Sequence, residues 1–246
     1  MKDLRSTSPG LPIGGGEMGQ LIREKDWNKT PLGDPEKWPQ SLRTTLNILL
    51  ASKFPKFLWW GPELTCFYND SYRPSLGVDG KHPTILGMSG EVAWPEIWHI
   101  IKPLMDKVLE NGESLWFEDL LVPIYRNGKI EDVYWTFSYS PARDDDDNIA
   151  GVLVTCAETT QEVLLKRKLE RSERKLRLII QQAPASIATF KGPNYVTDIA
   201  NANALQLWGR EAADVLKKPI LEAIPELAKQ GIKELLDDVY KTGNRF

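Results

Sequence analysis

The sequence predicts an α+β fold in which a five-stranded antiparallel sheet is flanked by helices. Capping helices precede this sheet, and a linker helix and the first half of a second domain follow it. Short segments in which apolar and polar residues alternate, as in half-buried strands, occupy much of residues 54–157. Segments with helical spacing of apolar residues stand before, between and after these strands. Landmarks of this region recur about 131 residues later, which indicates an internal repeat.

The composition excludes several classes of protein. The chain has 246 residues, 41% of them hydrophobic and 26% charged, as in globular proteins. A formal net charge of −3 gives no basic field for phosphates, so nucleic acid is not expected as a partner. No apolar run is long enough for a membrane span or a signal peptide, so a cytoplasmic location is expected. Cys66 and Cys156 lack metal-ligand spacing and indicate neither a disulfide framework nor a metal site.

The N-terminal region is expected to cover the sheet. Residues 1–16 are rich in Gly, Pro and Ser, which predicts a mobile arm. Gly14 to Gly19 formally match the GxGxxG phosphate loop, but no strand precedes them and the match is rejected. Residues 17–53 are expected to form capping helices at 17–25 and 39–52. The second helix places four leucines on one face, namely Leu42, Leu46, Leu49 and Leu50.

The first strands and the main helix are predicted from turns and caps. Residues 57–60 and 64–68 read as a hairpin closed by Gly61-Pro62-Glu63. Trp94-Pro95-Glu96 predicts the first turn of a helix that ends at Asn111-Gly112. The apolar face of this helix consists of Ile97, Ile101, Leu104, Met105 and Val108.

Three further strands are predicted at 116–125, 131–141 and 149–157. Asn127-Gly128 is a strong hairpin signal and is expected to join the first two of them. Asp144 to Asp147 lie in the next turn, where a solvated hairpin tip is favoured over a calcium loop because the alternating ligand pattern is absent. The second strand alternates its large apolar residues Val133, Trp135, Phe137 and Tyr139.

Nine tryptophans are an unusual feature, and three pairs of them fall within 54–137. They indicate one aromatic core or pocket, and ordinary core packing is the favoured interpretation because buried aromatics usually pack against each other. If a ligand pocket exists, the strand and helix positions give its candidate lining residues as Trp60, Phe67, Leu104, Trp135 and Phe137.

Residues 160–182 form a charged segment with helical spacing. Its apolar residues recur about every 3.5 positions, which is typical of a short coiled coil, while a single amphipathic linker helix is an equal alternative. A parallel homodimer would use Leu165, Leu169, Leu176 and Ile179.

The internal repeat identifies the last part of the chain. Gly61-Pro62 recurs as Gly192-Pro193, and Pro95-Glu96-Ile97 as Pro225-Glu226-Leu227. Residues 183–246 therefore repeat the hairpin and helices of the first unit. The partners of the later strands would lie beyond Phe246, so the chain is expected to stop inside a second domain.

The order of strands and helices, together with local motifs, resembles the PAS fold of sensory proteins. The motifs are Phe57-Leu58-Trp59-Trp60-Gly61-Pro62-Glu63, Tyr68-Asn69-Asp70, Tyr72-Arg73-Pro74, Lys81-His82-Pro83, Trp94-Pro95-Glu96-Ile97-Trp98 and Phe137-Ser138-Tyr139-Ser140-Pro141. They are similar to the N-terminal sensor PAS domain of bacterial multi-PAS sensor histidine kinases.

The resemblance implies a division of the chain and a relay element. It implies a complete first PAS domain at 54–159, a signalling linker helix at 160–182 and a truncated second PAS domain at 183–246. Glu158-Thr159-Thr160 occupy the place of the acidic-x-Thr junction through which PAS domains pass into signalling helices. The family's usual Asp is a Glu in this chain.

Catalytic residues and cofactor ligands are not indicated. His82 and His99 are followed by Pro83 and Ile100, so neither matches the phospho-accepting histidine of a histidine kinase. Haem is disfavoured because His99 lies about 200° around the helix from Ile97, away from the apolar face. Flavin is disfavoured because Cys66 lies in a strand and the Asn-Cys-Arg-Phe motif of photoactive PAS domains is absent. No cofactor is predicted, and an unknown small-molecule ligand remains open.

The leading hypothesis is therefore the tandem-PAS input region of a two-component histidine kinase. This segment is not expected to be an enzyme, whereas its parent would be a protein histidine kinase acting on a response regulator. The alternatives are an input region for a cyclic-dinucleotide or other output, a PAS module used only for dimerisation or interaction, and a small-molecule enzyme that uses the aromatic cleft.

Overall fold

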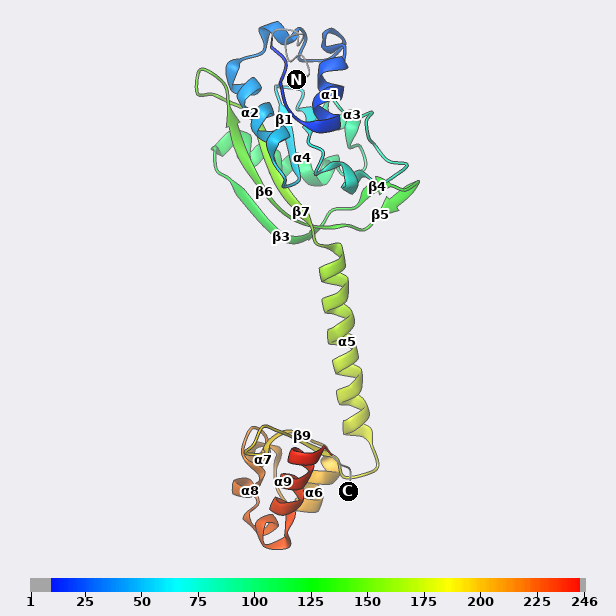
Figure 1. The fold of residues 1–246 in the computed structure, drawn as a ribbon, viewed down its shortest axis with the longest axis vertical. Helices are drawn as coiled ribbons and strands as arrows, with labels where there is room; N and C mark the ends of the chain where they lie inside the picture. Colours follow the sequence, from blue (N-terminus) through cyan, green and yellow to red (C-terminus); the bar gives the residue numbers. More distant parts are fainter. Residues whose placement is uncertain (1–9, 244–246) are drawn as a thin grey trace. The chain divides into compact units, whose positions relative to one another are not determined.

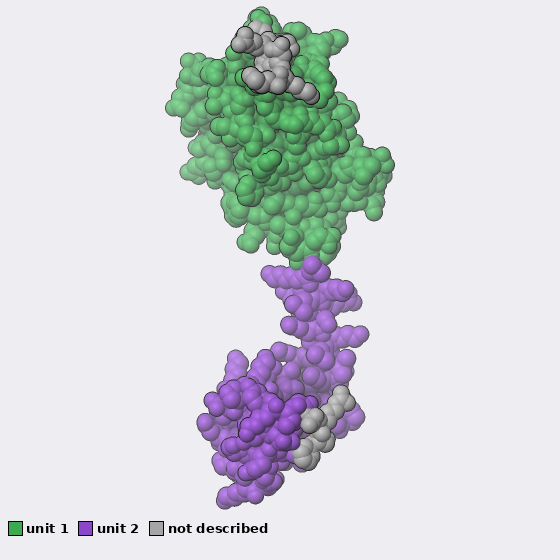
Figure 2. Space-filling view, viewed as in Figure 1, with its two compact units in different colours: residues 1–164 green, residues 165–246 purple. Residues whose placement is uncertain are grey.

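The computed structural model describes residues 10–243, and the chain divides into two compact units, 1–164 and 165–246 (Figure 2). The expected arm at 1–16 lies outside the described residues as far as residue 9. Its described part packs against unit 1. Leu11 contacts the core, and Arg23 donates hydrogen bonds to the carbonyls of Pro12 and Gly14.

The N-terminal helices of unit 1 form one cover of its sheet (Figure 1). α1 spans Gly16–Glu24 and α2 spans Gln40–Ala51, and the short 3₁₀ turns η1 (Trp27–Lys29) and η2 (Pro35–Lys37) connect them. The apolar face of α2 is buried as its leucine spacing predicts, with Leu42, Leu46, Leu49 and Leu50 inside. This burial supplies most of the stability of such a helix, because propensity alone is marginal at this length.

The sheet of unit 1 is five-stranded and antiparallel, in the order β2-β1-β7-β6-β3. The strands are β1 (Lys56–Trp60), β2 (Thr65–Tyr68), β3 (Leu115–Leu121), β6 (Tyr134–Arg143) and β7 (Ile149–Glu158). The expected hairpin of β1 and β2 is confirmed, and its turn places Gly61 at φ 76°.

The segment between β3 and β6 differs from the expected pair of long strands. β3 ends at Leu121, and β4 (Ile124–Arg126) and β5 (Lys129–Glu131) form a separate two-stranded hairpin. Asn127-Gly128 does form the turn, with both residues at positive φ, but it joins β4 to β5. The register of β3 against β6 shifts between Phe117 and Leu120, so the main ladder is already interrupted before the turn.

The main helix begins later than its sequence signals predict. α3 spans Gly90–Ala93, and α4 spans Trp98–Asn111. Trp94 leaves the helical region at φ −131° and ψ 49°, because it terminates α3 instead of starting α4. The predicted C-terminal cap is confirmed, since Gly112 is left-handed at φ 70°. A further 3₁₀ turn, η3 (Arg73–Leu76), follows β2.

The two faces of the sheet are covered by different elements. On β1, Phe57 and Trp59 share one face, and Leu58 and Trp60 share the other, as alternation along a strand requires. α4 packs on the first face and α2 on the second. The described core of unit 1 is thus two apolar layers with the sheet between them.

Unit 2 contains most of α5 (Thr160–Gln182), a two-stranded hairpin and short helices. The hairpin strands are β8 (Ala188–Lys191) and β9 (Val196–Ala200). The remaining elements are α6 (Ala202–Trp208), α7 (Ala212–Val215), α8 (Ile220–Ala223), η4 (Pro225–Gln230) and α9 (Ile232–Thr242).

One asparagine in each unit fastens the end of a helix to the following strand. The Asn69 amide donates to the carbonyls of Leu49, Ser52 and Phe54 at 3.1, 3.1 and 2.8 Å. Its oxygen accepts from the backbone N–H of Lys56. Asn201 repeats this pattern in unit 2, where its amide donates to the carbonyls at the end of α5 and in the turn that follows, those of Ile180, Ala183 and Ala185.

Candidate functional site

Unit 1 contains a partly open aromatic cavity of about 60 Å³ between the sheet, α4 and the β4 segment. Seven aromatic side chains line it, namely Phe57, Trp59, Tyr72, Trp94, Trp135, Phe137 and Tyr139. The other lining residues are Ile97, Ile101, Val122, Ile124, Val154 and Cys156. The wall carries no ionisable acid or base of the Asp, Glu, Lys, Arg or His type.

The residues proposed from the sequence as a pocket lining are divided by the sheet. Trp135 and Phe137 lie in the cavity wall. Trp60 and Phe67 lie on the opposite face, where the Phe67 ring stacks on Trp27 with a centroid distance of 5.1 Å. Leu104 is half-buried on α4 and is not part of the wall. These three placements follow from strand parity and helix phase, which the sequence pattern did not resolve.

The lining residues that sequence reasoning missed are mostly neighbours of the proposed ones. Phe57 and Trp59 alternate with Leu58 and Trp60 on β1, so a shift of one residue exchanges the two sets. Tyr139 continues the alternation of Trp135 and Phe137, which could have identified it.

Besides the indole N–H groups of Trp59, Trp94 and Trp135, three polar groups lie in the wall, the hydroxyls of Tyr72 and Tyr139 and the thiol of Cys156. Burial raises the pKa of all three, that of Cys156 to about 12. They are therefore uncharged at neutral pH. Neither hydroxyl has a hydrogen-bond partner within residues 10–243, and the thiol makes only a weak contact with the Pro55 carbonyl at 3.8 Å.

A half-buried ion pair ties the segment before α4 to the β4–β5 hairpin. The Lys81 ammonium lies 3.0 Å from Glu96 Oε2, and both side chains are 13% exposed. Glu96 Oε1 accepts a hydrogen bond from the backbone N–H of Tyr125 in β4. The same ammonium lies 5.1 Å from the ring centroid of Trp94, within range of a cation–π interaction.

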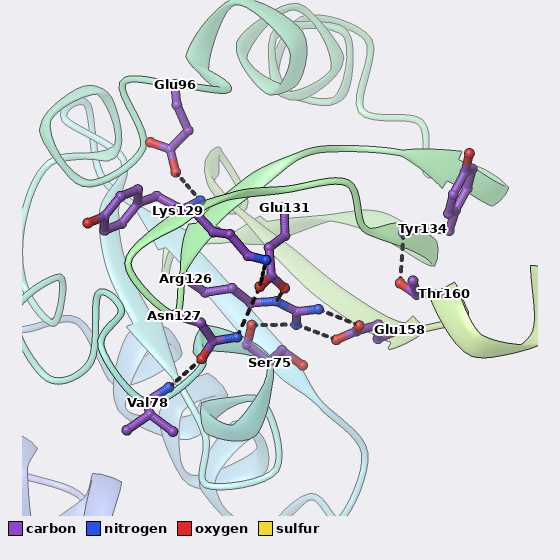
Figure 3. Close-up of polar contacts among 11 residues, drawn as sticks. Ser75, Val78, Glu96, Arg126, Asn127, Lys129, Glu131, Tyr134, Glu158 and Thr160 are labelled. Carbon is purple, nitrogen blue, oxygen red and sulfur yellow. Dashed lines mark hydrogen bonds and ion pairs between the residues drawn. The ribbon is translucent and has the colours of Figure 1, made fainter. Parts of the chain in front are cut away.

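Arg126 connects the β4–β5 hairpin to the last residue of the sheet (Figure 3). Its guanidinium donates to both carboxylate oxygens of Glu158 at 2.8 Å. It also donates to Glu131 at 2.9 Å and to the Ser75 carbonyl at 3.1 Å. These partners raise the pKa of Arg126, with the Glu158 hydrogen bonds contributing most. Bidentate geometry of this kind fixes orientation as well as adding energy.

The next two residues attach the first turn of α5 to the sheet. The Thr159 N–H donates to the Tyr134 carbonyl at 2.8 Å, and its hydroxyl donates to Asp119 at 2.6 Å. The Thr160 hydroxyl accepts from the Tyr134 N–H at 3.0 Å. Glu158, Thr159 and Thr160, the residues of the expected junction, thus each contact the sheet or its hairpin.

The cavity wall and this junction are adjacent along the chain. Val122 and Ile124 line the cavity, and Arg126 follows two residues later on the same strand as Ile124. A displacement of the hairpin that moves Ile124 also moves the guanidinium that holds Glu158. We call Arg126, Glu131 and Glu158 the arginine clamp.

Four apolar residues of α5 proposed as a dimer contact are exposed in this single chain. Leu165, Leu169, Leu176 and Ile179 are 64, 60, 58 and 57% accessible. Across the described helices, none combines the length and apolar character needed to cross a membrane. Groups of three or more His, Cys, Asp or Glu placed to hold a metal are absent from the part of the chain that the structure describes.

Residues 64–164 match the family model described as PAS fold. They carry four of the five strands of the antiparallel sheet and the helices that cover the cavity. Unit 1 has the PAS fold. A search of curated proteins found no match.

Solved structures similar to this chain include several PAS domains. A sensory box sensor histidine kinase from Vibrio cholerae is 18% identical, with 48% of this chain and 89% of that chain covered and a TM-score of 0.35. The PAS domain of BvgS from Bordetella pertussis is 18% identical over 55% and 99% of the two chains, with a TM-score of 0.33. The LOV domain of a blue-light activated histidine kinase from Erythrobacter litoralis is 12% identical over 44% and 96%, with a TM-score of 0.34.

Proposed function

We propose that unit 1 is the sensory PAS domain of a signal-transducing protein, and that it converts a change at its aromatic cavity into a change at the start of α5. The arginine clamp carries this proposal. Arg126 holds Glu158 with two hydrogen bonds of 2.8 Å, and Ile124 of the same short strand lines the cavity. A ligand or a protein signal that displaces this strand would act on the clamp directly.

The arrangement suits a two-state relay because both Arg126–Glu158 hydrogen bonds depend on the same relative position of the guanidinium and the carboxylate. A bidentate pair loses its geometry when the hairpin shifts by more than the tolerance of a hydrogen bond. Glu158 is 27% exposed, so water can solvate the released carboxylate and the open state is not prohibitively costly. A ligand that binds the two states with different affinities would then shift their populations.

The same proposal extends to the parent protein, which we infer to be a cytoplasmic bacterial two-component histidine kinase. Its kinase region, outside this chain, would pass phosphate to a response regulator. The motifs at 57–63, 94–98 and 137–141 support this through their resemblance to sensor PAS domains of such kinases. A cyclic-dinucleotide or other output, or a role in dimerisation alone, is the alternative that the parent sequence would identify.

Unit 2 is proposed to be the first half of a second PAS domain in tandem with the first. The Asn201 pattern supports this, because it repeats the Asn69 pattern with the same three acceptors per amide and an offset of about 132 residues. Tyr195 also repeats the positive φ of Leu64 in the hairpin turn, at 52° and 50°.

A parallel homodimer through α5 would complete the relay. Leu165, Leu169, Leu176 and Ile179 would occupy its a and d positions, with Ser172 at the remaining d position. This assignment places Lys168 at g and Glu173 at the following e position, an attractive interchain pair in a parallel, in-register dimer. Light scattering of the full chain is expected to give a dimer, and Leu169→Glu with Leu176→Glu a monomer. A monomeric wild-type chain at high concentration would contradict this part.

The relay is tested by enlarging one residue of the cavity wall. Ile124→Trp places an indole at a buried wall position, and Ile130→Trp places it on the neighbouring strand at a position that is 61% exposed. We expect Ile124→Trp to accelerate hydrogen exchange of the Val163 amide, which donates to the Thr159 carbonyl, by about tenfold or more. Ile130→Trp should leave it unchanged. Equal exchange in both variants would contradict the proposed function.

A further inference from the structure

The cavity of unit 1 excludes charged ligands by its composition. Its lining contains no carboxylate, ammonium, guanidinium or imidazole group. The wall contains no cationic side chain to pair with a bound anion, and burying an unpaired charge is unfavourable. Aromatic rings can bind cations, but the Trp94 ring already carries the Lys81 ammonium at 5.1 Å. The Lys81 ammonium therefore places one positive charge beside the wall, and it would repel a second cation.

The wall of the same cavity contains two hydroxyls and a thiol that can hydrogen-bond to a ligand. We call Tyr72, Tyr139 and Cys156 the polar corner, because they carry the hydroxyl and thiol groups of the cavity wall. Tyr139 and Cys156 belong to the adjacent strands β6 and β7, and the Tyr72 ring stacks on Trp135 of β6 with a centroid distance of 6.0 Å, so the corner lies at the sheet. Its two hydroxyls have no hydrogen-bond partner elsewhere in residues 10–243, and an unpaired hydroxyl in an apolar site is unfavourable. A ligand with one polar group would supply the missing partner.

Four aliphatic residues of the cavity wall lie outside the five-stranded sheet. Ile97 and Ile101 come from the start of α4, Val122 from the approach to β4, and Ile124 is the first residue of β4. The volume of about 60 Å³ is small. A cavity of about 150 Å³ accepts benzene, so this one has room for roughly two or three heavy atoms before the wall must move.

We propose that this cavity binds a small uncharged molecule with one hydrogen-bonding group and a short hydrocarbon part, the chemistry of a short-chain alcohol or ketone. The polar group contacts Tyr72 and Tyr139, and the hydrocarbon part points towards Val122 and Ile124. A longer hydrocarbon part presses on the segment that leads to the arginine clamp. The inference rests on the proposed function for its biological meaning and on the cavity for its chemistry.

The test uses a homologous series of primary alcohols, from methanol to pentanol, added to the full chain. The nine tryptophans give indole N–H signals by NMR, which single Trp→Phe variants assign. Trp94 and Trp135 report the cavity, whereas Trp116, which is 66% exposed, reports non-specific solvent effects. Affinity is expected to rise about fourfold per added methylene until the cavity is full, then to level off or fall.

The polar corner is tested by variants that keep the ring. Tyr139→Phe, alone and with Tyr72→Phe, is expected to weaken ethanol binding by roughly two- to tenfold per hydroxyl. Tyr125→Phe, at a position that is 42% exposed, is the matched control and should not change affinity. Tetramethylammonium and propionate, which carry charge, should give no saturable shift of the cavity indoles.

The outcomes separate this inference from the function on which it rests. Saturable binding of the alcohols supports the inference, and an unchanged exchange rate of the Val163 amide at saturation would then contradict only the relay. Tighter binding of tetramethylammonium or propionate overturns the inference, even if Val163 exchange responds. The absence of any saturable shift at Trp94 and Trp135 for every alcohol also overturns it.

Discussion

Replacing Arg126 by Met is expected to lower the stability of unit 1 by about 2–3 kcal/mol. The side chain is 13% exposed and makes four hydrogen bonds, three of them to carboxylate oxygens of Glu131 and Glu158. Removing one partner of a fully buried ion pair costs about 3–5 kcal/mol. Water reaches both carboxylates, which are 23 and 27% exposed, so we expect a value at or below the lower end.

Urea unfolding followed by tryptophan fluorescence measures this loss in the full chain. Eight of the nine tryptophans precede residue 165, so the signal reports unit 1. With a slope of about 2 kcal/mol/M, the midpoint should fall by about 1–1.5 M. Arg143→Met is the matched control, because Arg143 is 47% exposed and, within residues 10–243, pairs only with Asp147 at the tip between β6 and β7. It should change stability by less than about 0.5 kcal/mol.

A double-mutant cycle separates the clamp from general packing. Glu158→Gln removes the charge of the main partner with little change of shape. We expect a coupling of at least about 1.5 kcal/mol between Arg126→Met and Glu158→Gln, since each Arg126–Glu158 hydrogen bond involves two charged groups. If Arg126→Met behaves like Arg143→Met, or if the two changes are additive, the reasoning about the clamp is wrong.

Three further outcomes follow from single contacts. Asn69→Ala should lower the free energy of unfolding by about 3 kcal/mol or more, because it leaves several buried backbone groups unpaired. Asn47→Ala, which removes one exposed hydrogen bond, should change this free energy little. Asp145→Asn should lower the urea midpoint, because this carboxylate accepts from two N–H groups at the start of α2, and Asp146→Asn should not. The Arg126 guanidinium lowers the pKa of Glu131. The Arg126–Glu131 interaction therefore stabilises unit 1 at neutral pH, and this stabilisation is lost as pH falls through the lowered pKa. A pH series of urea midpoints should show this loss in the wild type and less of it in Arg126→Met.

Local signals were sufficient for most elements of unit 1. The leucine spacing of α2 and the positive-φ turn at Asn127-Gly128 depend only on neighbouring residues, and both are confirmed. The hairpin that this turn joins was assigned wrongly, because the interruption of β3 depends on its register against β6. The start of α4 was placed too early, because Trp94 serves the preceding turn.

The candidate site was harder to predict because it depends on strand parity across the sheet. Positions 59 and 60 are both Trp, so the sequence does not distinguish them, and only the pairing of β1 with β2 and β7 decides which one faces α4. The contact of Arg126 with Glu158 spans 32 residues of sequence and has no local pattern. The solvated tip expected at 144–147 also makes a contact that its composition does not indicate. Asp145 accepts hydrogen bonds from the first N–H groups of α2, more than a hundred residues away in the sequence.

α5 is held at both of its ends by hydrogen bonds from outside the helix. Its first residue, Thr160, accepts from Tyr134, while near its end the Ile180 carbonyl accepts from Asn201. The whole helix has 23 residues and is about 35 Å long. Apart from its first turn the helix exposes nearly all of its side chains, so its own propensity and its end contacts hold its position. Loosening either end should therefore change α5 more than any substitution on its polar faces, and a partner helix that covers the leucine stripe would make it rigid.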